Sequence, residues 1–141
     1  ASRRGHMVVE LENLDIFSDL EAYTFAREFV QERGYRICVD GLTHQTIAMV
    51  DRKRLGADLI KLVWHSDMVD ERKDVEGDLR SVVRRAGKNK VVLCRCDDRE
   101  AVDFGRAIGI GLFQGRHIEH LIAEENRKRD LRRLKARIQN N

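Results

Sequence analysis

The sequence contains no apolar segment long enough to cross a lipid bilayer. A membrane-spanning helix needs about 20 consecutive apolar residues, whereas charged residues make up 36% of this 141-residue chain and interrupt each apolar run. The chain also lacks the basic start and apolar core of a secretory signal. We therefore expect a cytoplasmic protein that has no membrane partner.

The sequence also has few cysteines and no large excess of charge of one sign. Three cysteines, an odd number with two of them at Cys94 and Cys96, do not make a disulfide framework and fit a reducing compartment. The 27 basic and 24 acidic residues nearly cancel, so the net charge of +3 indicates no particular partner. With 42% apolar residues, the chain is sufficient for one domain with a buried core.

Sequence motifs for several common chemistries are absent. There is no HExxH metal motif and no nucleophile elbow, and the glycines between positions 105 and 115 are turns and helix stops that do not form a phosphate-binding loop. Cys94 and Cys96, with only Cys38 to support them, fall short of a four-ligand zinc site. We expect these cysteines to be small buried hydrophobic residues, and we expect neither a metal nor a cofactor.

Three runs of β-branched and aliphatic residues predict the centre of the fold. They cover 36–39, 59–64 and 91–96, and none has the polar alternation of a half-exposed strand, so we expect strands covered on both faces. Stretches with helical periodicity separate the runs, which is the pattern of a parallel α/β sheet with right-handed crossovers. The other predicted elements are strands at 8–12 and 111–115 and helices near 19–33, 47–55, 79–86, 100–108 and 117–138.

The predicted order is a strand and a helix repeated four times, followed by a short strand and a long helix. A complete barrel of this kind needs about 250 residues, so we expect an open sheet or a partial, TIM-barrel-like one. We divide the chain into residues 1–7, an expression-tag remnant that ends in Gly-His-Met; residues 8–123, a truncated α/β domain; and residues 124–141, a basic carboxyl-terminal helix extension.

The carboxyl-terminal extension holds the most basic segment of the chain. Between positions 127 and 137, seven lysines and arginines stand against Asp130 alone. Such a cluster fits a nucleic acid, but no aromatic residues are interleaved, and cations at a helix end also complement the helix dipole. We prefer the second interpretation, so nucleic acid is not an expected partner. Leu131, Leu134 and Ile138 leave open a third interpretation, a helix-pairing seam.

Two ionisable residues interrupt the apolar runs. Asp40 follows the first run and Lys61 lies inside the second, and sites in parallel α/β folds gather at the carboxyl ends of strands. A buried ammonium group needs a partner, and we expect Asp40 on the adjacent strand to pair with Lys61. An ordinary alternative role for Asp40 is to cap the following helix.

Five short stretches have an order and spacing that match a known family. They are Glu10-Leu11-Glu12-Asn13, Asp40-Gly41-Leu42-Thr43-His44, Lys61-Leu62-Val63, Leu93-Cys94-Arg95-Cys96-Asp97 and Gln114-Gly115. Together with the Leu-Gly-Ala-Asp-Leu-Ile-Lys phrase at 55–61, they resemble the carboxyl-terminal part of the EAL domain family. These are bacterial cyclic di-GMP phosphodiesterases built on a modified TIM barrel. The resemblance covers residues 8–122 and implies an EAL-like sheet.

The resemblance also implies a ligand-binding site. The residues that keep the family's chemical character are Glu10, Asp40, Lys61, Asp97 and Gln114. Three other family positions have lost it, at Asn13, Gly41 and Cys94. Hydrolysis of a phosphodiester by two metal ions needs several oxygen ligands, and these replacements remove them. From the sequence we therefore expect vestigial binding residues, no catalytic residue, no metal ligand and no enzymatic activity.

The expected function follows from this loss. We expect a degenerate EAL-like module of a bacterial signalling protein that binds a protein partner or associates with itself, because the open edge of a half-length sheet presents unpaired backbone groups. Two alternatives stay open. One is a receptor that binds cyclic di-GMP weakly without hydrolysing it, and the other is a weak phosphodiesterase whose missing ligands come from a partner chain.

Overall fold

The computed structural model describes residues 7–70 and 73–139, and its centre is one sheet of five parallel strands. Residues 1–6 of the predicted tag remnant lie outside the described residues. The strands lie side by side in chain order, which confirms the predicted parallel α/β, partial TIM-barrel-like sheet. They are β1 (Val8–Glu12), β2 (Arg36–Leu42), β3 (Leu59–Val63), β4 (Val91–Cys94) and β5 (Leu112–Phe113).

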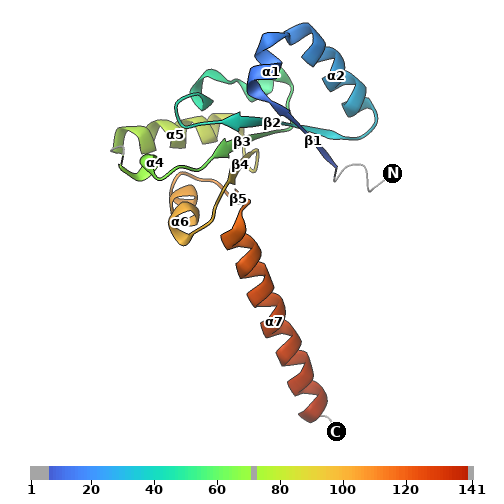
Figure 1. Ribbon diagram of the computed structural model, residues 1–141, viewed down its shortest axis with the longest axis vertical. Coiled ribbons are helices and arrows are strands. Elements are labelled where there is room, and N and C mark those ends of the chain that lie inside the picture. Colours follow the sequence, from blue (N-terminus) through green and yellow to red (C-terminus); the bar gives the residue numbers. More distant parts are fainter. Residues whose placement is uncertain (1–6, 71–72, 140–141) are drawn as a thin grey trace.

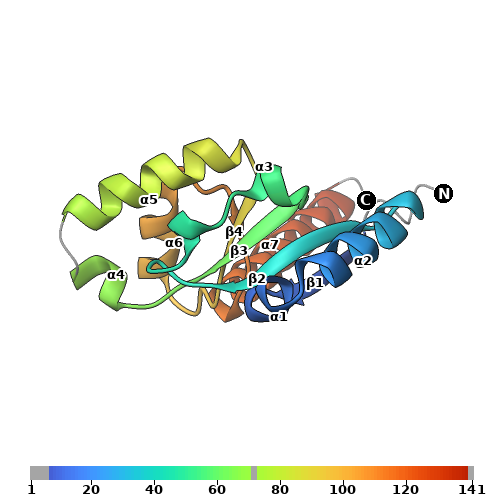
Figure 2. The same cartoon turned by 90° about the horizontal axis from the view of Figure 1, so that it is seen from above.

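The helices that connect the strands all cover the same, convex face of the sheet (Figures 1 and 2). Right-handed crossovers between neighbouring parallel strands turn to one side, which accounts for this arrangement. The connections are α1 (Asn13–Ser18) and α2 (Leu20–Glu32), η2 (Ile47–Met49, a 3₁₀ helix) and α3 (Arg52–Leu55), α4 (Asp67–Asp70) and α5 (Lys73–Ala86), and α6 (Arg99–Ala107). The last helix, α7 (Arg116–Gln139), follows β5.

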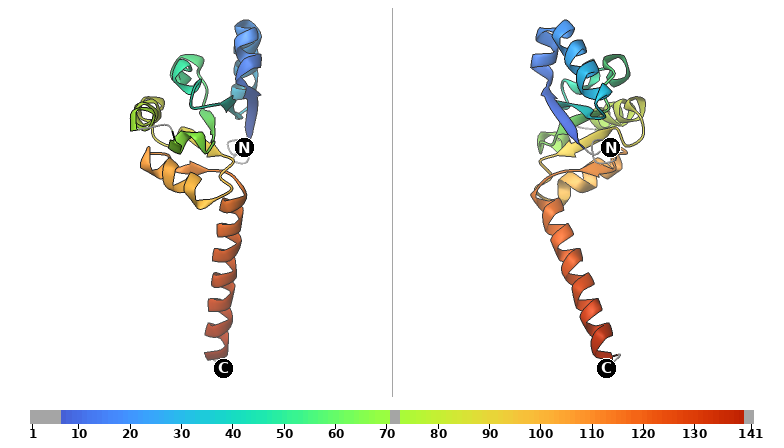
Figure 3. Two further views of the ribbon diagram at one scale, coloured as in Figure 1. Left: turned by 60° about the vertical axis from the view of Figure 1, so that its left-hand side comes forward. Right: turned by 90° about the vertical axis from the view of Figure 1, so that its right-hand side faces the viewer.

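The hydrophobic core lies between the sheet and these helices. Successive residues of a strand point to opposite faces, and the residues that point toward the helices are almost fully buried. They are Ile37, Val39, Ile60, Leu62, Val91 and Leu93, each at 2% exposure or less. The prediction that the strands are covered on both faces is wrong for the described residues, since the concave face carries no helix (Figure 3).

The segment between β1 and α2 differs from the sequence prediction. The sequence predicts no element between the strand at 8–12 and the helix near 19–33, but this segment forms α1. Asp19 caps α2, because its carboxylate accepts a hydrogen bond from the Ala22 backbone nitrogen at 3.0 Å. A helix end exposes such unpaired nitrogens, and a carboxylate is among their best partners.

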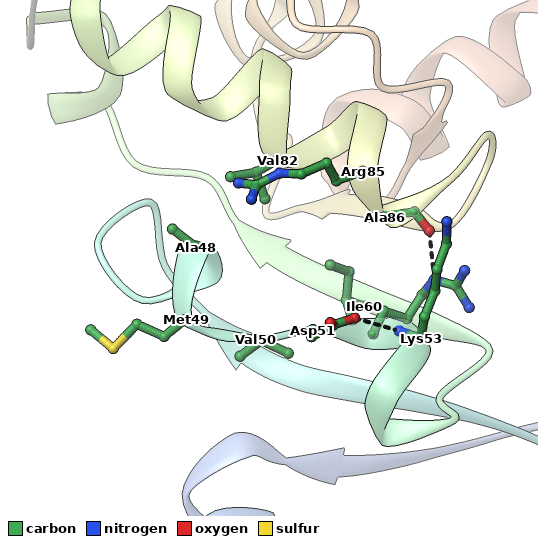
Figure 4. A pocket seen from close by; sticks show the side chains of 10 residues that line it. Ala48, Met49, Val50, Asp51, Lys53, Ile60, Val82, Arg85 and Ala86 are labelled. Atoms are coloured by element: carbon green, nitrogen blue, oxygen red, sulfur yellow. Dashed lines mark hydrogen bonds between the residues drawn. The ribbon is translucent and has the colours of Figure 1, made fainter.

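The helix predicted at 47–55 is two short turns, η2 and α3. The covering layer is therefore thin here, and a pocket of about 320 Å³ lies between these turns and α5 (Figure 4). Val82 and Arg85 lie on the α5 side of this pocket and Ala48 and Met49 on the η2 side. Arg52 joins the two sides, because its Nε donates to the Ala86 carbonyl at 2.7 Å.

Strand β5 is shorter than the predicted strand at 111–115. The strand ends at Phe113. Two residues further on, Gly115 has a φ of 151°, and a Cβ at this position would collide with the backbone of Cys96. Only glycine allows the chain to pass so close to the end of β4. This contact fixes the point from which α7 begins.

Helix α7 extends away from the sheet and the other helices (Figures 1 and 3). At 1.5 Å per residue its 24 residues span about 36 Å, and none of them is buried. No helix in the described part of the chain has the length and apolarity to cross a membrane. Ile118, near the start of α7, packs partly buried against the core, which is otherwise built without this helix.

Leu93→Ala is expected to lower the free energy of unfolding by about 2–5 kcal/mol, because the truncation leaves a cavity at a fully buried position. The matched change Leu134→Ala, at a side chain that is 54% exposed on α7, is expected to stay within about 0.5 kcal/mol. Urea denaturation followed by circular dichroism measures both. Equal costs would mean that α7 packs against the domain in solution.

Candidate ligand-binding site

The carboxyl ends of the strands surround a cleft of about 430 Å³. Its lining residues are Glu12, Asp40, Gly41, Lys61, Val63, Cys94, Arg95, Asp97, Gln114, Gly115, Arg116 and Glu119. The structure thus brings Asp40, Lys61, Asp97 and Gln114 together, as expected for residues at one edge of a parallel sheet. The remaining predicted residue, Glu10, lies on the concave face as the partner of Lys61.

Lys61 is a buried charged residue, with 6% of its surface exposed. Its Nζ donates a hydrogen bond to Glu10 Oε1 and forms an ion pair with it. Glu10 lies on β1 and Lys61 on β3, and the β2 residue in register with Glu10 is Cys38, whose small side chain leaves room for this contact. The prediction that Asp40 is the ion-pair partner of Lys61 is therefore wrong.

Asp40 has a local partner instead. Its Oδ1 accepts a hydrogen bond from the Gly41 backbone nitrogen at 2.7 Å, inside β2. The alternative role as a helix cap is also wrong, since the next helix, η2, begins only at Ile47. Asp40 acts on Lys61 through its charge alone.

The surroundings of Lys61 raise its pKa. Burial by itself would lower this pKa, but the hydrogen bond and charge of Glu10, and then the charge of Asp40, raise it above the ordinary value of 10.5. Burial also raises the pKa of the neighbouring Cys38 thiol to about 12. The concave face therefore holds the charged ammonium group of Lys61 beside the neutral thiol of Cys38. All three cysteines are buried, as predicted.

The carboxylate of Glu12 also lines the cleft, although Glu12 is not among the site residues predicted from the sequence. It follows Glu10 by two residues on β1, so both point to the same face, and it is in register with Asp40. Gly41 has a φ of 81°, and a Cβ there would collide with the Glu12 carboxylate. Glu12 therefore fills the space of the side chain that Gly41 lacks. The alternation along β1 was the signal that could have identified it.

Arg116 and Asp97 form the other end of the cleft. The Arg116 backbone nitrogen and Nη2 donate to the Asp97 carboxylate at 3.1 and 3.4 Å, and these hydrogen bonds from Arg116 lower the pKa of Asp97. Asp97 thus joins the start of α7 to the chain after β4. Arg95 also lines the cleft and has a φ of 60°, which is uncommon for a residue other than glycine.

The donors in the cleft do not form a complete metal site by themselves. Among the residues that the structure describes, no three His, Cys, Asp or Glu side chains lie close enough together to hold a metal ion. Lys61 engages Glu10 and Arg116 engages Asp97. A divalent cation beside Glu12 and Asp40 would need further oxygen ligands from a bound nucleotide, from water or from a second chain.

Solved structures with an EAL domain fold are similar to this chain. The Bacillus subtilis YkuI protein, which has an EAL domain and is in complex with substrate c-di-GMP and calcium, matches with a TM-score of 0.62 at 16% identity over 82% of this chain and 28% of that one. The PaMucR phosphodiesterase in its c-di-GMP complex matches with a TM-score of 0.58 at 17% identity over 79% of this chain and 47% of that one. The chain spans less than half of either structure. No family model and no curated protein matches it.

These similarities confirm the EAL-like fold and correct one conclusion. The prediction that the chain is not an enzyme is wrong, because it is contradicted by structural neighbours that include a phosphodiesterase and a protein bound to its substrate. The prediction had counted the side chains lost at Asn13, Gly41 and Cys94. It did not allow for a carboxylate such as that of Glu12, which comes from another strand into the space beside Gly41.

Lys61→Met is expected to change the free energy of unfolding by less than about 1 kcal/mol, because methionine has a similar volume and the buried charge is removed with its desolvation cost. Glu10→Gln is expected to cost about 1–2 kcal/mol, because the ammonium group then lacks its charged partner. Urea denaturation at neutral pH measures both. A larger cost for Lys61→Met than for Glu10→Gln would contradict this account.

The pH dependence provides a control for this comparison. Because the pKa of Lys61 is raised in the folded state, the stability difference between wild type and Glu10→Gln is fully present below the ordinary lysine pKa of 10.5. It is lost as the pH rises through the higher folded-state value.

Proposed function

We propose that this chain is part of a bacterial cyclic di-GMP signalling module and binds the cyclic dinucleotide in the cleft at the carboxyl ends of its strands. The observation that carries this proposal is the set of cations, Lys61, Arg95 and Arg116, around one cleft in a fold whose solved neighbours are complexes with c-di-GMP. The cleft volume of about 430 Å³ is also typical of a ligand site. Free, buried thiols fit the reducing cytoplasm that we propose as its compartment.

The charges in the cleft suggest how the nucleotide lies. Glu12 and Asp40 are at the ends of β1 and β2, whereas Arg95 and Arg116 are beyond β4 and β5, with Lys61 on the strand between them. Phosphate oxygens are expected toward the cations, because charge-assisted hydrogen bonds are the strongest available. Phosphodiester cleavage would then use the two carboxylates together with ligands supplied by a second chain.

Calorimetric titration with cyclic di-GMP tests this proposal. Binding is expected for the wild type and is expected to weaken by at least about tenfold in Arg116→Gln, because a charge-assisted contact to phosphate is lost. Arg137→Gln is the matched control, since it removes the same charge from the distal part of α7, and it is expected to bind like wild type. Absence of heat with the wild type at high ligand concentration would refute nucleotide binding.

We further propose that the concave side of the sheet contacts a second copy of the chain. Within the described part of the chain, β1 pairs with β2 alone and β5 with β4 alone, so both edges present unpaired backbone groups. A groove of about 510 Å³ on the concave face has apolar lining residues, among them Val8, Leu59, Val92 and Leu112. Because all strands run in the same direction, a twofold axis along them places β1 of one copy beside β5 of the other.

Sedimentation equilibrium tests this contact. The wild type is expected to reach twice its chain mass of 16.4 kDa at high concentration. Val8→Lys is expected to shift it toward monomer, because a lysine at a sheet edge opposes pairing. Leu134→Lys adds the same charge on α7 and is expected to have no effect. If Leu134→Lys dissociates the dimer instead, the contact lies on α7. If the wild type is a monomer at high concentration, the proposed dimer contact is excluded.

A further inference from the structure

A pocket lined by cations lies at the amino ends of the strands, opposite the cleft at their carboxyl ends. It has a volume of about 520 Å³ and is formed by the last turns of α5 and α6 and by the turns that follow them. These turns lead into β4 and β5, so the pocket belongs to the amino ends of the strands. α5 and α6 lie side by side on the convex face (Figures 1 and 2). None of the residues that line the pocket also lines the cleft.

Four basic side chains line this pocket: Arg80, Arg84, Lys88 and Arg106. Arg80 joins the two helices, because its Nη2 donates to the Ala107 carbonyl at 2.9 Å. The pocket lining contains no carboxylate among the residues whose side chains the structure describes. Among the described residues, Arg84, Lys88 and Arg106 also have no ion-pair partner. The pocket therefore gathers positive charge that these residues do not neutralise.

The ordinary explanation for cations at a helix end is that they complement the helix dipole. The carboxyl ends of α5 and α6 both meet here, and each contributes about half a negative charge. Together they offset about one of the three positive charges of Arg84, Lys88 and Arg106. About two positive charges remain, next to the buried side chains of Val83 and Ile108, which hold water away from one side. The dipoles alone do not account for this concentration of charge.

We propose that this pocket is a second ligand site, which binds the adjacent phosphate groups of a free oligophosphate chain such as that of a nucleoside polyphosphate. A polyvalent anion supplies the charge that the pocket lacks, and guanidinium groups bind phosphate oxygens in pairs. The volume lies within the range of about 300–1,000 Å³ that is usual for small-molecule sites. The site is independent of the nucleotide cleft at the other edge of the sheet.

Calorimetric titration of the full chain with tripolyphosphate tests this proposal. Tripolyphosphate is expected to bind at least about tenfold more tightly than orthophosphate, because several charges are matched at once. The double variant Arg84→Gln, Lys88→Gln is expected to weaken tripolyphosphate binding by at least about tenfold, and Arg106→Gln is expected to weaken it as well. The matched control Arg129→Gln, Lys135→Gln removes the same charge from α7 and is expected to change the affinity less than about twofold.

Three results would overturn the proposal. The first is no heat with tripolyphosphate, and the second is an equal loss of affinity in the pocket variant and in the α7 control, which would indicate attraction to net charge alone. The third is a short single-stranded oligonucleotide that binds the pocket more tightly than tripolyphosphate, which would assign it to a nucleic-acid backbone. All the substituted residues are exposed, and circular dichroism verifies that the variants fold.

Discussion

Each strand of the sheet lies beside the strand that precedes it in sequence and runs in the same direction, and the rest of the structure depends on this order. Right-handed crossovers between such strands place all the connecting helices on one face. The core forms on that face, where Ile37, Leu62 and Leu93 have almost no exposure. The concave face has no such cover in the described residues, yet Lys61 on this face is only 6% exposed, so its ammonium group needs a partner within the sheet. Lys61 meets this requirement through Glu10 on another strand.

The same arrangement separates three surfaces of different chemistry. The carboxyl ends of the strands carry a cleft with both carboxylates and cations, and the amino ends carry a pocket whose described charged residues are all basic. The concave face between them mixes apolar residues such as Leu59 and Val92 with the pair of Lys61 and Glu10 and with further polar side chains. The cleft and the pocket share no lining residue, so the two proposed ligands would not compete for the same side chains.

Helix α7 shows how a long element can be positioned by contacts near its first turn, where Ile118 packs against the core. Its first turn is held by the hydrogen bonds from Arg116 to Asp97 and by the close approach of Gly115 to Cys96. Beyond this turn the helix relies on its own backbone hydrogen bonds and on exposed pairs such as Arg127 with Glu124, which contribute little each. Its direction is thus set at one end, by Gly115, by the carboxylate of Asp97 and by the partly buried side chain of Ile118.

The sequence by itself determined the kind of each main element, the parallel order of the strands and the edge at which Asp40, Lys61, Asp97 and Gln114 gather. The kinds of elements and the parallel order of the strands follow from periodicity and continuous apolar runs, which are local properties of the chain. Asp97 and Gln114, in contrast, are implied only by the resemblance to EAL domains. Only the tertiary structure decided that Lys61 pairs with Glu10 and that Glu12 fills the space beside Gly41. Such contacts depend on strand register and on the size of the side chain between two partners, and the spacing of residues along one chain does not contain that information.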